Sequence, residues 1–299
     1  MAAPLGEATV FDLRPAAGRL EREALMPQPQ DGHRYTFGVT EVARERLDLL
    51  AHVFEPSSRA YLEKVADAEP QLALDLGCGP GHTTALVRRV TAARRTVGID
   101  AAPDFIEKAT TRFGEAGLEF MVADVMCLPS KVTPADLIFA RFLLAHLPDL
   151  PGRVAAWVAH LTPGGVLATE EAEDILTEEP VFRSYLELAR GVVASTGGTL
   201  YAGPLLGRLG GSANIERISS NVADLAVRAS DAAQMFRLNL RSLRDEPWVR
   251  MHRTDAELAR LDAELSELSH TPAENVTWKL RQAAFRRQDS DGCRSAFVR

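Results

Sequence analysis

The stretch LALDLGCGPG, residues 72–81, decides the fold of this chain. Its apolar first half is long enough for a buried strand and carries Asp75, after which glycines follow at Gly77, Gly79 and Gly81. Glycine lets the backbone turn sharply and lie against a ligand without a Cβ in the way. The stretch therefore predicts a strand, a ligand-binding loop and a following helix.

Two kinds of ligand fit a glycine loop of this form. Dinucleotide-binding loops follow the pattern G-x-G-x-x-G and place a pyrophosphate at the N-terminus of a helix. Here the third glycine position of that pattern holds His82. The carboxylate of Asp75 is a poor neighbour for a pyrophosphate but a good one for the ammonium group of an amino acid. The loop therefore favours a ligand that contains an amino acid, and a nicotinamide-dependent oxidoreductase is the alternative.

Four later segments continue the strand pattern, and helical stretches separate them. The segments are residues 96–100, which end at Asp100, residues 120–125, which contain Asp124, residues 135–141, and residues 161–167, which contain a Pro-Gly-Gly turn. Alternating strands and helices predict a doubly wound parallel sheet, and ligands bind such sheets at the carboxyl ends of the strands. We therefore expect the acidic residues to meet at one edge of the sheet.

These motifs, in this order and spacing, resemble those of class I S-adenosylmethionine-dependent methyltransferases. The flanks around Tyr35, Arg46 and residues 141–149 resemble bacterial members that act on small molecules, many of them in specialised metabolism. The resemblance is specific over residues 72–171 and looser over 33–286. It implies an α/β fold with a doubly wound, mostly parallel, seven-stranded Rossmann-like sheet, helical cap elements and one antiparallel strand in the final pair.

The resemblance also implies a cofactor, S-adenosyl-L-methionine, with S-adenosyl-L-homocysteine as its product. It places the ribose at Asp100, the adenine amino group at Asp124 and the methionine portion on the glycine loop, with the ammonium group at Asp75. Tyr35 and Arg46 are expected to cover the methionine end. The complete set of expected cofactor-binding residues is Tyr35, Arg46, Asp75, Gly77, Cys78, Gly79, Gly81, Asp100, Ala101, Asp124, Val125 and Arg141.

Three side chains are candidates for the chemistry. His146 follows the fourth strand, near the place where a methyl acceptor must lie, and histidine ordinarily titrates near neutral pH, as a general base should. Its alternative role is to pack beside the cofactor and cap a turn. Glu170 and Glu171 follow the fifth strand and could act as a base or bind a substrate amine. No Asp/Asp/Asn cluster stands out, so we expect no metal.

The remaining organisation can be predicted from proline content and periodicity. Residues 1–32 are expected to form a flexible tail, and residues 33–299 a single methyltransferase domain with a cofactor-binding core at 70–175. Cap and substrate elements are expected at about 33–60 and 178–275. Helices are predicted over residues 40–55, 56–67, 181–194 and 229–243, a capping box at residues 254–257, and strands over 215–226 and 276–285.

Composition limits the function. A net charge of −7 argues against general binding to nucleic acid, which requires a basic surface. Three cysteines fit neither a disulfide framework nor a zinc site and favour the cytoplasm, and no apolar run approaches a membrane span. We expect methyl transfer to an O, N or C nucleophile of a small molecule, and a cap helix could support a homodimer. The alternatives are the oxidoreductase and a non-catalytic, cofactor-binding regulatory protein.

Overall fold

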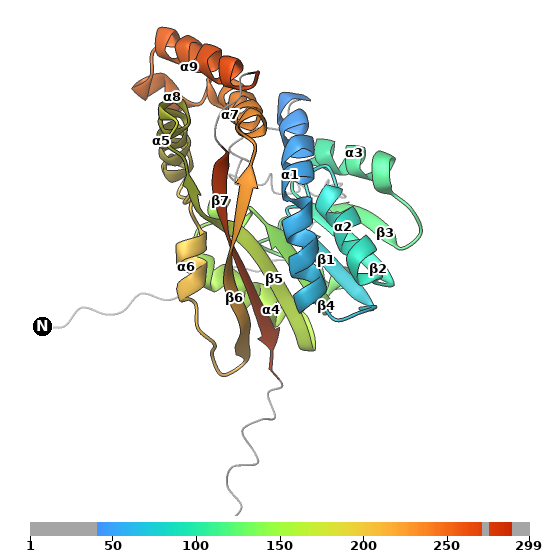
Figure 1. Ribbon diagram of the computed structural model, residues 1–299. Coiled ribbons are helices and arrows are strands. Elements are labelled where there is room, and N and C mark those ends of the chain that lie inside the picture. Colours follow the sequence, from blue (N-terminus) through green and yellow to red (C-terminus); the bar gives the residue numbers. More distant parts are fainter. Residues whose placement is uncertain (1–40, 271–274, 289–299) are drawn as a thin grey trace, which may run out of the picture. The chain divides into compact units, whose positions relative to one another are not determined.

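A seven-stranded sheet organises the part of the chain that this computed structural model describes, residues 41–270 and 275–288 (Figure 1). The strands are β1 (Leu72–Leu76), β2 (Arg95–Asp100), β3 (Leu118–Val122), β4 (Ala135–Arg141), β5 (Leu161–Leu176), β6 (Ile215–Val227) and β7 (Val276–Arg287). They lie in the order β3-β2-β1-β4-β5-β7-β6. The pairs from β3 to β5 are parallel, whereas β7 is antiparallel to both β5 and β6. The predicted α/β sheet is therefore confirmed in outline, but it is mixed and not purely parallel.

Helices cover both faces of this sheet. The helices are α1 (Glu41–Val65), α2 (His82–Thr91), α3 (Pro103–Phe113), α4 (Leu150–Ala159), α5 (Pro180–Ser195), α6 (Gly203–Arg208), α7 (Ala229–Leu243), α8 (Pro247–His252) and α9 (Asp255–Leu268), with 3₁₀ turns η1 (Ser130–Val132) and η2 (Leu144–His146). Successive side chains of a strand point to opposite faces of the sheet. On β1, Ala73 packs with α1 and α2, whereas Leu74 packs with α4. None of the helices in residues 41–270 is both long and apolar enough to cross a bilayer.

The cap is built from α5, α7, α8 and α9. Helix α5 follows β5, and the other three connect β6 to β7 (Figure 1). Their apolar faces share one core cluster with Phe54 of α1 and with the start of β7. The helices predicted over 181–194 and 229–243 are observed, and Thr254 forms the predicted capping box with Glu257 at the start of α9. Helices α6 and α8 are short and were not predicted.

Three predicted boundaries are wrong. The fifth strand, β5, continues to Leu176, so Glu170 and Glu171 lie within it and do not follow it. Helices expected over 40–55 and 56–67 are one continuous helix, α1, which runs through Pro56. Proline removes one helical hydrogen bond, but packing of both halves of α1 offsets that loss. The third strand begins at Leu118 and ends at Val122, so Asp124 lies two residues beyond it. The expected tail at 1–32 and Tyr35 lie outside the described residues.

Glu170 on β5 fastens α1 to the sheet. Its side chain is fully buried, and its carboxyl group accepts hydrogen bonds from the hydroxyls of Ser57 (3.1 Å) and Ser58 on α1. It also accepts one from Nε2 of Gln282 on β7 (2.7 Å). The guanidinium of Arg141 lies beside this group, donates to the Ser58 hydroxyl at 3.0 Å, and has its pKa lowered by burial. Glu170 therefore satisfies several buried donors at once.

Replacing Glu170 by alanine should destabilise the fold. The change removes the acceptor of the buried donors Ser58 and Gln282 and of the partly buried Ser57 hydroxyl, and it leaves Arg141 without its neighbouring carboxyl group. We expect a loss of about 3 kcal/mol in the free energy of unfolding, measured by urea denaturation. The control is Glu178→Ala, which removes an exposed carboxylate and should cost less than about 0.5 kcal/mol. Equal effects of the two substitutions would contradict this role for Glu170.

Candidate active site

The loop between β1 and α2 can be built only with glycine at its key positions. Gly77, Gly79 and Gly81 have φ angles of +66°, +51° and +92°. A Cβ on Gly77 would lie 2.9 Å from Cδ1 of Leu143, and one on Gly81 would lie 2.9 Å from the ring of Phe120. Both the left-handed backbone and the close contacts exclude larger residues. The result is a tightly curved, largely buried stretch of backbone at the carboxyl end of β1.

Asp75 holds this loop to the helix that follows. The carboxylate is buried, and its Oδ2 accepts hydrogen bonds from the hydroxyls of Thr83 (2.5 Å) and Thr84 (2.7 Å) at the start of α2. Burial raises the pKa of Asp75 to about 6, although both hydroxyls and Arg141 oppose that rise. Cys78 is also buried in the loop, and burial raises the pKa of its thiol. Asp75 and Cys78 therefore stabilise the loop from its buried side.

Asp100 ends β2 beside the glycine loop. Its Oδ2 accepts a hydrogen bond from the amide of Gly79 at 2.9 Å, and its Oδ1 accepts one from the amide of Ala102 at 2.9 Å. Burial raises its pKa, while these backbone donors lower it. Each carboxylate oxygen can accept a further donor. The geometry thus suits a ligand that offers two hydroxyl groups, and the backbone of Ala101 lies next to that position.

The turn after β3 supplies the third acidic residue. Asp124 is exposed, and its Oδ1 accepts from the amide of Met126 at 2.8 Å. Val125 is buried, and its carbonyl accepts from Nε1 of Trp157 on α4 at 2.9 Å. Because β1, β2 and β3 are adjacent and parallel, Asp75, Asp100 and Asp124 follow one edge of the sheet. The structure therefore brings the predicted acids to one edge.

The loop after β4 borders both the glycine loop and a pocket in the cap. Leu143 in this loop faces Gly77, whereas Phe142 and His146 line the pocket. Phe142 has a φ of +54°, which is uncommon for a bulky residue, and its amide donates to the carbonyl of Glu170. Oε1 of Glu171 accepts from the amides of Leu143 (2.8 Å) and Leu144 (2.7 Å). Glu171 thus fixes the conformation of this loop.

Burial gives two side chains of the pocket unusual protonation states. It raises the pKa of Glu171 to about 8, against the opposing effect of the backbone donors. It also lowers the pKa of His146 to about 4, and the positive charge of Arg46 adds to that shift. At pH 7 Glu171 therefore carries a proton, and the His146 ring is neutral. The pKa of His146 therefore lies below the near-neutral value expected of a general base. Its neutral ring can accept a hydrogen bond, whereas Glu171 can donate one.

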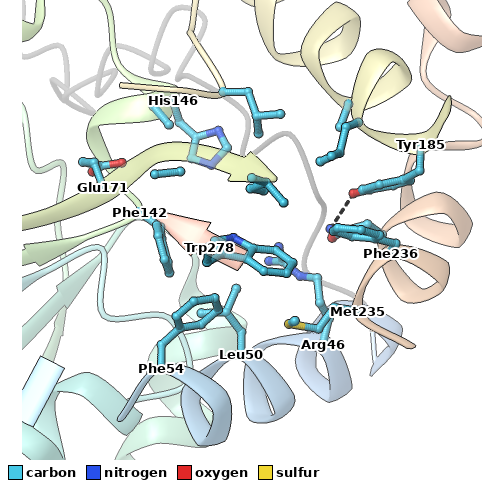
Figure 2. Close-up of a pocket in the computed structure, with 17 residues that line it drawn as sticks. Arg46, Leu50, Phe54, Phe142, His146, Glu171, Tyr185, Met235, Phe236 and Trp278 are labelled. Atoms are coloured by element: carbon cyan, nitrogen blue, oxygen red, sulfur yellow. Dashed lines mark hydrogen bonds between the residues drawn. The ribbon is translucent and has the colours of Figure 1, made fainter. Parts of the chain in front are cut away.

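The pocket has a volume of about 110 Å³ and lies between α1, the loop after β4, β5 and the cap (Figure 2). Its walls are formed by Arg46, Leu50, Phe54, Phe142, Ala145, His146, Glu171, Ala172, Ile175, Tyr185, Leu186, Ala189, Leu200, Met235, Phe236, Asn239 and Trp278. Three predicted site residues, Arg46, His146 and Glu171, therefore meet here. Glu170 and Arg141 do not line the pocket, and Glu170 lies instead in the buried hydrogen-bond network with Ser57, Ser58 and Gln282.

Sequence reasoning missed the aromatic wall of this pocket. Tyr185 lies on α5, Phe236 on α7 and Trp278 on β7, at positions that look like ordinary core residues. They share no motif, since their contact depends on how the cap packs on the sheet. Their apolar character within predicted helices and a predicted strand was the only signal, and it did not distinguish a core from a pocket.

Comparison with known proteins indicates the class of protein to which part of this chain is similar. Residues 73–165 match the family model described as a methyltransferase domain. The match contains the glycine loop, Asp100, Asp124 and His146. The predicted class I S-adenosylmethionine-dependent methyltransferase domain is therefore confirmed for this segment, and the matches give no support to the oxidoreductase alternative.

Individual relatives agree with this class. The chain is 37% identical over 134 residues to a trans-aconitate 2-methyltransferase of Methylobacterium radiotolerans, covering 45% of this chain and 48% of that protein. It is 32% identical over 149 residues to one of Azoarcus sp., covering 50% and 57%. The chain thus spans about half the length of the curated relatives it matches. A crystal structure of coclaurine N-methyltransferase with N-methylheliamine and SAH covers 78% of this chain and 72% of its own, with 16% identity and a TM-score of 0.48, an overlap too partial to bear on function.

The protonation of Glu171 can be tested through the pH dependence of stability. Between the ordinary pKa of 4.5 and the folded value of about 8, the unfolded chain releases the proton that the folded chain retains. The native protein therefore loses stability as pH rises through this window. Glu171→Gln keeps an acceptor for the two amides but carries no proton to lose. The free energy of unfolding of the variant, relative to the native protein, should rise by up to about 1.4 kcal/mol per pH unit between pH 5 and 8.

Urea denaturation at several pH values measures this difference. Glu178→Gln provides the control, because it changes an exposed glutamate in the same way. Parallel pH profiles for the native protein and Glu171→Gln would show that Glu171 titrates normally.

Proposed function

We propose that this chain catalyses methyl transfer from S-adenosylmethionine to a small-molecule acceptor. The observation that carries the proposal is the hydrogen bond from the Gly79 amide in the glycine loop to the carboxylate of Asp100. Both groups lie at the carboxyl ends of the adjacent parallel strands β1 and β2. Open α/β sheets bind their ligands at this edge. The match of residues 73–165 to a methyltransferase domain supports the same conclusion.

The chain has residues suited to each part of the cofactor. The curve at Gly77–Gly81 would hold the methionine portion, Asp100 the ribose hydroxyls, and Asp124 with Val125 the adenine. Arg46 and Tyr35 would cover the methionine end, and Asp75 would orient the ammonium group. Cys78, Ala101 and Arg141 would complete the cofactor-binding site. When bound, S-adenosylmethionine supplies a methyl group activated by its sulfonium. The protein contributes by orienting the two reactants and excluding water.

The pocket beyond the loop after β4 would hold the acceptor. His146 lines it and is neutral at pH 7, so it can take the proton of a hydroxyl acceptor. A positioned base of this kind typically contributes about 10²–10⁴-fold to the rate. Glu171, which holds its own proton, would orient the acceptor by donating a hydrogen bond.

The biological setting follows as part of the proposal. The net charge of −7 favours a free metabolite over a nucleic acid as the acceptor. We place the enzyme in specialised metabolism in the cytoplasm. It would act as a single domain over residues 33–299, and the cap could support a homodimer.

Removing the carboxylate of Asp100 should weaken cofactor binding. Asp100→Ala takes away the acceptor for the ribose hydroxyls and the acceptor that holds the Gly79 amide. We expect the Kd for S-adenosylhomocysteine, measured by calorimetry, to rise at least tenfold. Asp67→Ala, an exposed change before β1, should leave the affinity within twofold. Unchanged affinity in Asp100→Ala would remove Asp100 from the cofactor site.

Replacing His146 should affect turnover more than cofactor binding. His146→Ala is expected to lower kcat by about 10²-fold or more, because the acceptor loses its base. The Kd for S-adenosylhomocysteine should change less than threefold. Steady-state assays with 4-hydroxybenzyl alcohol as the acceptor, together with calorimetry, make this comparison. A similar loss in both quantities would make His146 a structural residue.

A further inference from the structure

Five aromatic rings form a continuous wall around the pocket (Figure 2). Phe142 and Phe54 meet edge to face with centroids 5.1 Å apart, and Phe54 meets Trp278 in the same way at 5.7 Å. Trp278 lies 5.5 Å from Phe236, which stacks on Tyr185 at 4.3 Å. Aromatic and aliphatic walls of this kind favour ligands that bury apolar surface, and ring ligands can add edge-to-face contacts.

Charge in the pocket is scarce. Among the described lining residues, Arg46 is the only arginine or lysine. His146 is neutral at pH 7 and Glu171 is protonated, because burial shifts both pKa values. A ligand with several carboxylates would lose its hydration here without enough cationic partners, which is costly. The walls therefore do not suit a polycarboxylate such as trans-aconitate, which names the relatives.

The walls that set this character lie mostly outside the residues matched by the family model. Tyr185, Phe236 and Trp278 come after residue 165, the end of that match, and Phe54 comes before its start. The cap of this chain can thus select a different acceptor from the one that names the relatives, while the cofactor-binding core stays alike.

Polar groups lie at two opposite ends of the aromatic wall. His146 and Glu171 lie on one side of Trp278, and Tyr185 lies on the other (Figure 2). At the second end, Nδ2 of Asn239 donates to the Tyr185 hydroxyl at 2.7 Å. Oδ1 of Asn239 is buried and has no hydrogen-bond partner among the described residues. This carbonyl can accept a hydrogen bond from a ligand hydroxyl.

We propose that the methyl acceptor is an uncharged phenol with a single aromatic ring and a second polar substituent. The proposal rests on the methyltransferase function above. The ring would lie within the aromatic wall, with the reacting hydroxyl at His146 and the second substituent at Asn239. The pocket volume of about 110 Å³ limits the acceptor to a single ring, because it is smaller than the apolar cavity of about 150 Å³ that binds benzene.

Methyl transfer to the phenol is a single displacement at the methyl carbon. The phenol oxygen forms a bond to the methyl carbon as the bond between that carbon and the sulfonium sulfur breaks. The electron pair of the broken bond stays on sulfur, which gives S-adenosylhomocysteine. The phenolic proton passes to the ring of His146 and from there to solvent. No oxidant, reductant or further reactant is needed.

Two ligands test the proposal on the full chain. The protein, saturated with S-adenosylhomocysteine, is titrated by calorimetry with 4-hydroxybenzyl alcohol and separately with trans-aconitate. We expect 4-hydroxybenzyl alcohol to bind at least tenfold more tightly. With S-adenosylmethionine in place of the product, it should also yield the methyl ether, detected by mass spectrometry. Preferential binding of trans-aconitate, or no binding of the phenol, would overturn the proposal.

A matched pair of substitutions on α5 tests the location. Ala189 lines the pocket and is buried, whereas Ala194 on the same helix is exposed. Ala189→Leu should fill the space for the ring and weaken phenol binding at least tenfold, and Ala194→Leu should not change it. Asn239→Leu gives a second test, because it removes the partner for the polar substituent. Phenol binding that persists unchanged in both pocket variants would overturn the assignment to this pocket.

The affinity for S-adenosylhomocysteine distinguishes failure of the proposed methyltransferase function from failure of the proposed acceptor. It should stay within threefold in Ala189→Leu, Ala194→Leu and Asn239→Leu, which also shows that each variant is folded. If the native protein fails to bind S-adenosylhomocysteine, the proposed function falls together with this inference. If it binds S-adenosylhomocysteine but not the phenol, only the inference about the acceptor falls.

Discussion

Parallel pairing of β1 with β2 on one side and β4 on the other is the constraint on which the site depends. The chain runs outward from β1 to β3 and then returns to place β4 on the opposite side. At such a reversal the loops at the carboxyl ends diverge and leave a crevice. The glycine loop after β1 and the loop after β4 lie at this reversal, and Gly77 packs closely against Leu143.

Two adjacent glutamates on β5 have different surroundings because their side chains point to opposite faces of the sheet. Neighbouring side chains on a strand point to opposite faces. Glu170 faces α1 and satisfies hydroxyl and amide donors there, while Glu171 faces the loop after β4 and lines the pocket. Both are buried, and of the two only Glu171 lines the pocket. One carboxyl group therefore holds the helix that covers the site, and the other shapes the site itself.

Much of the core could be predicted from the sequence because its signals are local. The strand over Ala135–Arg141 has the predicted limits, and Asp75 and Asp100 lie at the carboxyl ends of β1 and β2 as expected. Each of these features depends on a few consecutive residues and on the geometry of parallel strands. The function of Glu170 could not be predicted in this way, since its partners Ser57 and Gln282 are more than 100 residues away along the chain.

The pocket in the cap could not be predicted from the sequence for the same reason. Phe54, Tyr185, Phe236 and Trp278 come from four elements, and only the packed cap brings their rings together. Periodicity identifies a buried face but does not show whether another side chain or a ligand will cover it. The hypothesis about the acceptor therefore depends on the structure, whereas the hypothesis about the cofactor had already followed from sequence.

The most direct test of the central claim is a calorimetric titration of the native protein with S-adenosylhomocysteine, and with NAD as the competing ligand. The glycine loop and Asp100 predict micromolar binding of S-adenosylhomocysteine and no binding of NAD. Binding of NAD, or failure to bind S-adenosylhomocysteine, would contradict the assignment of this edge of the sheet to a methyl donor.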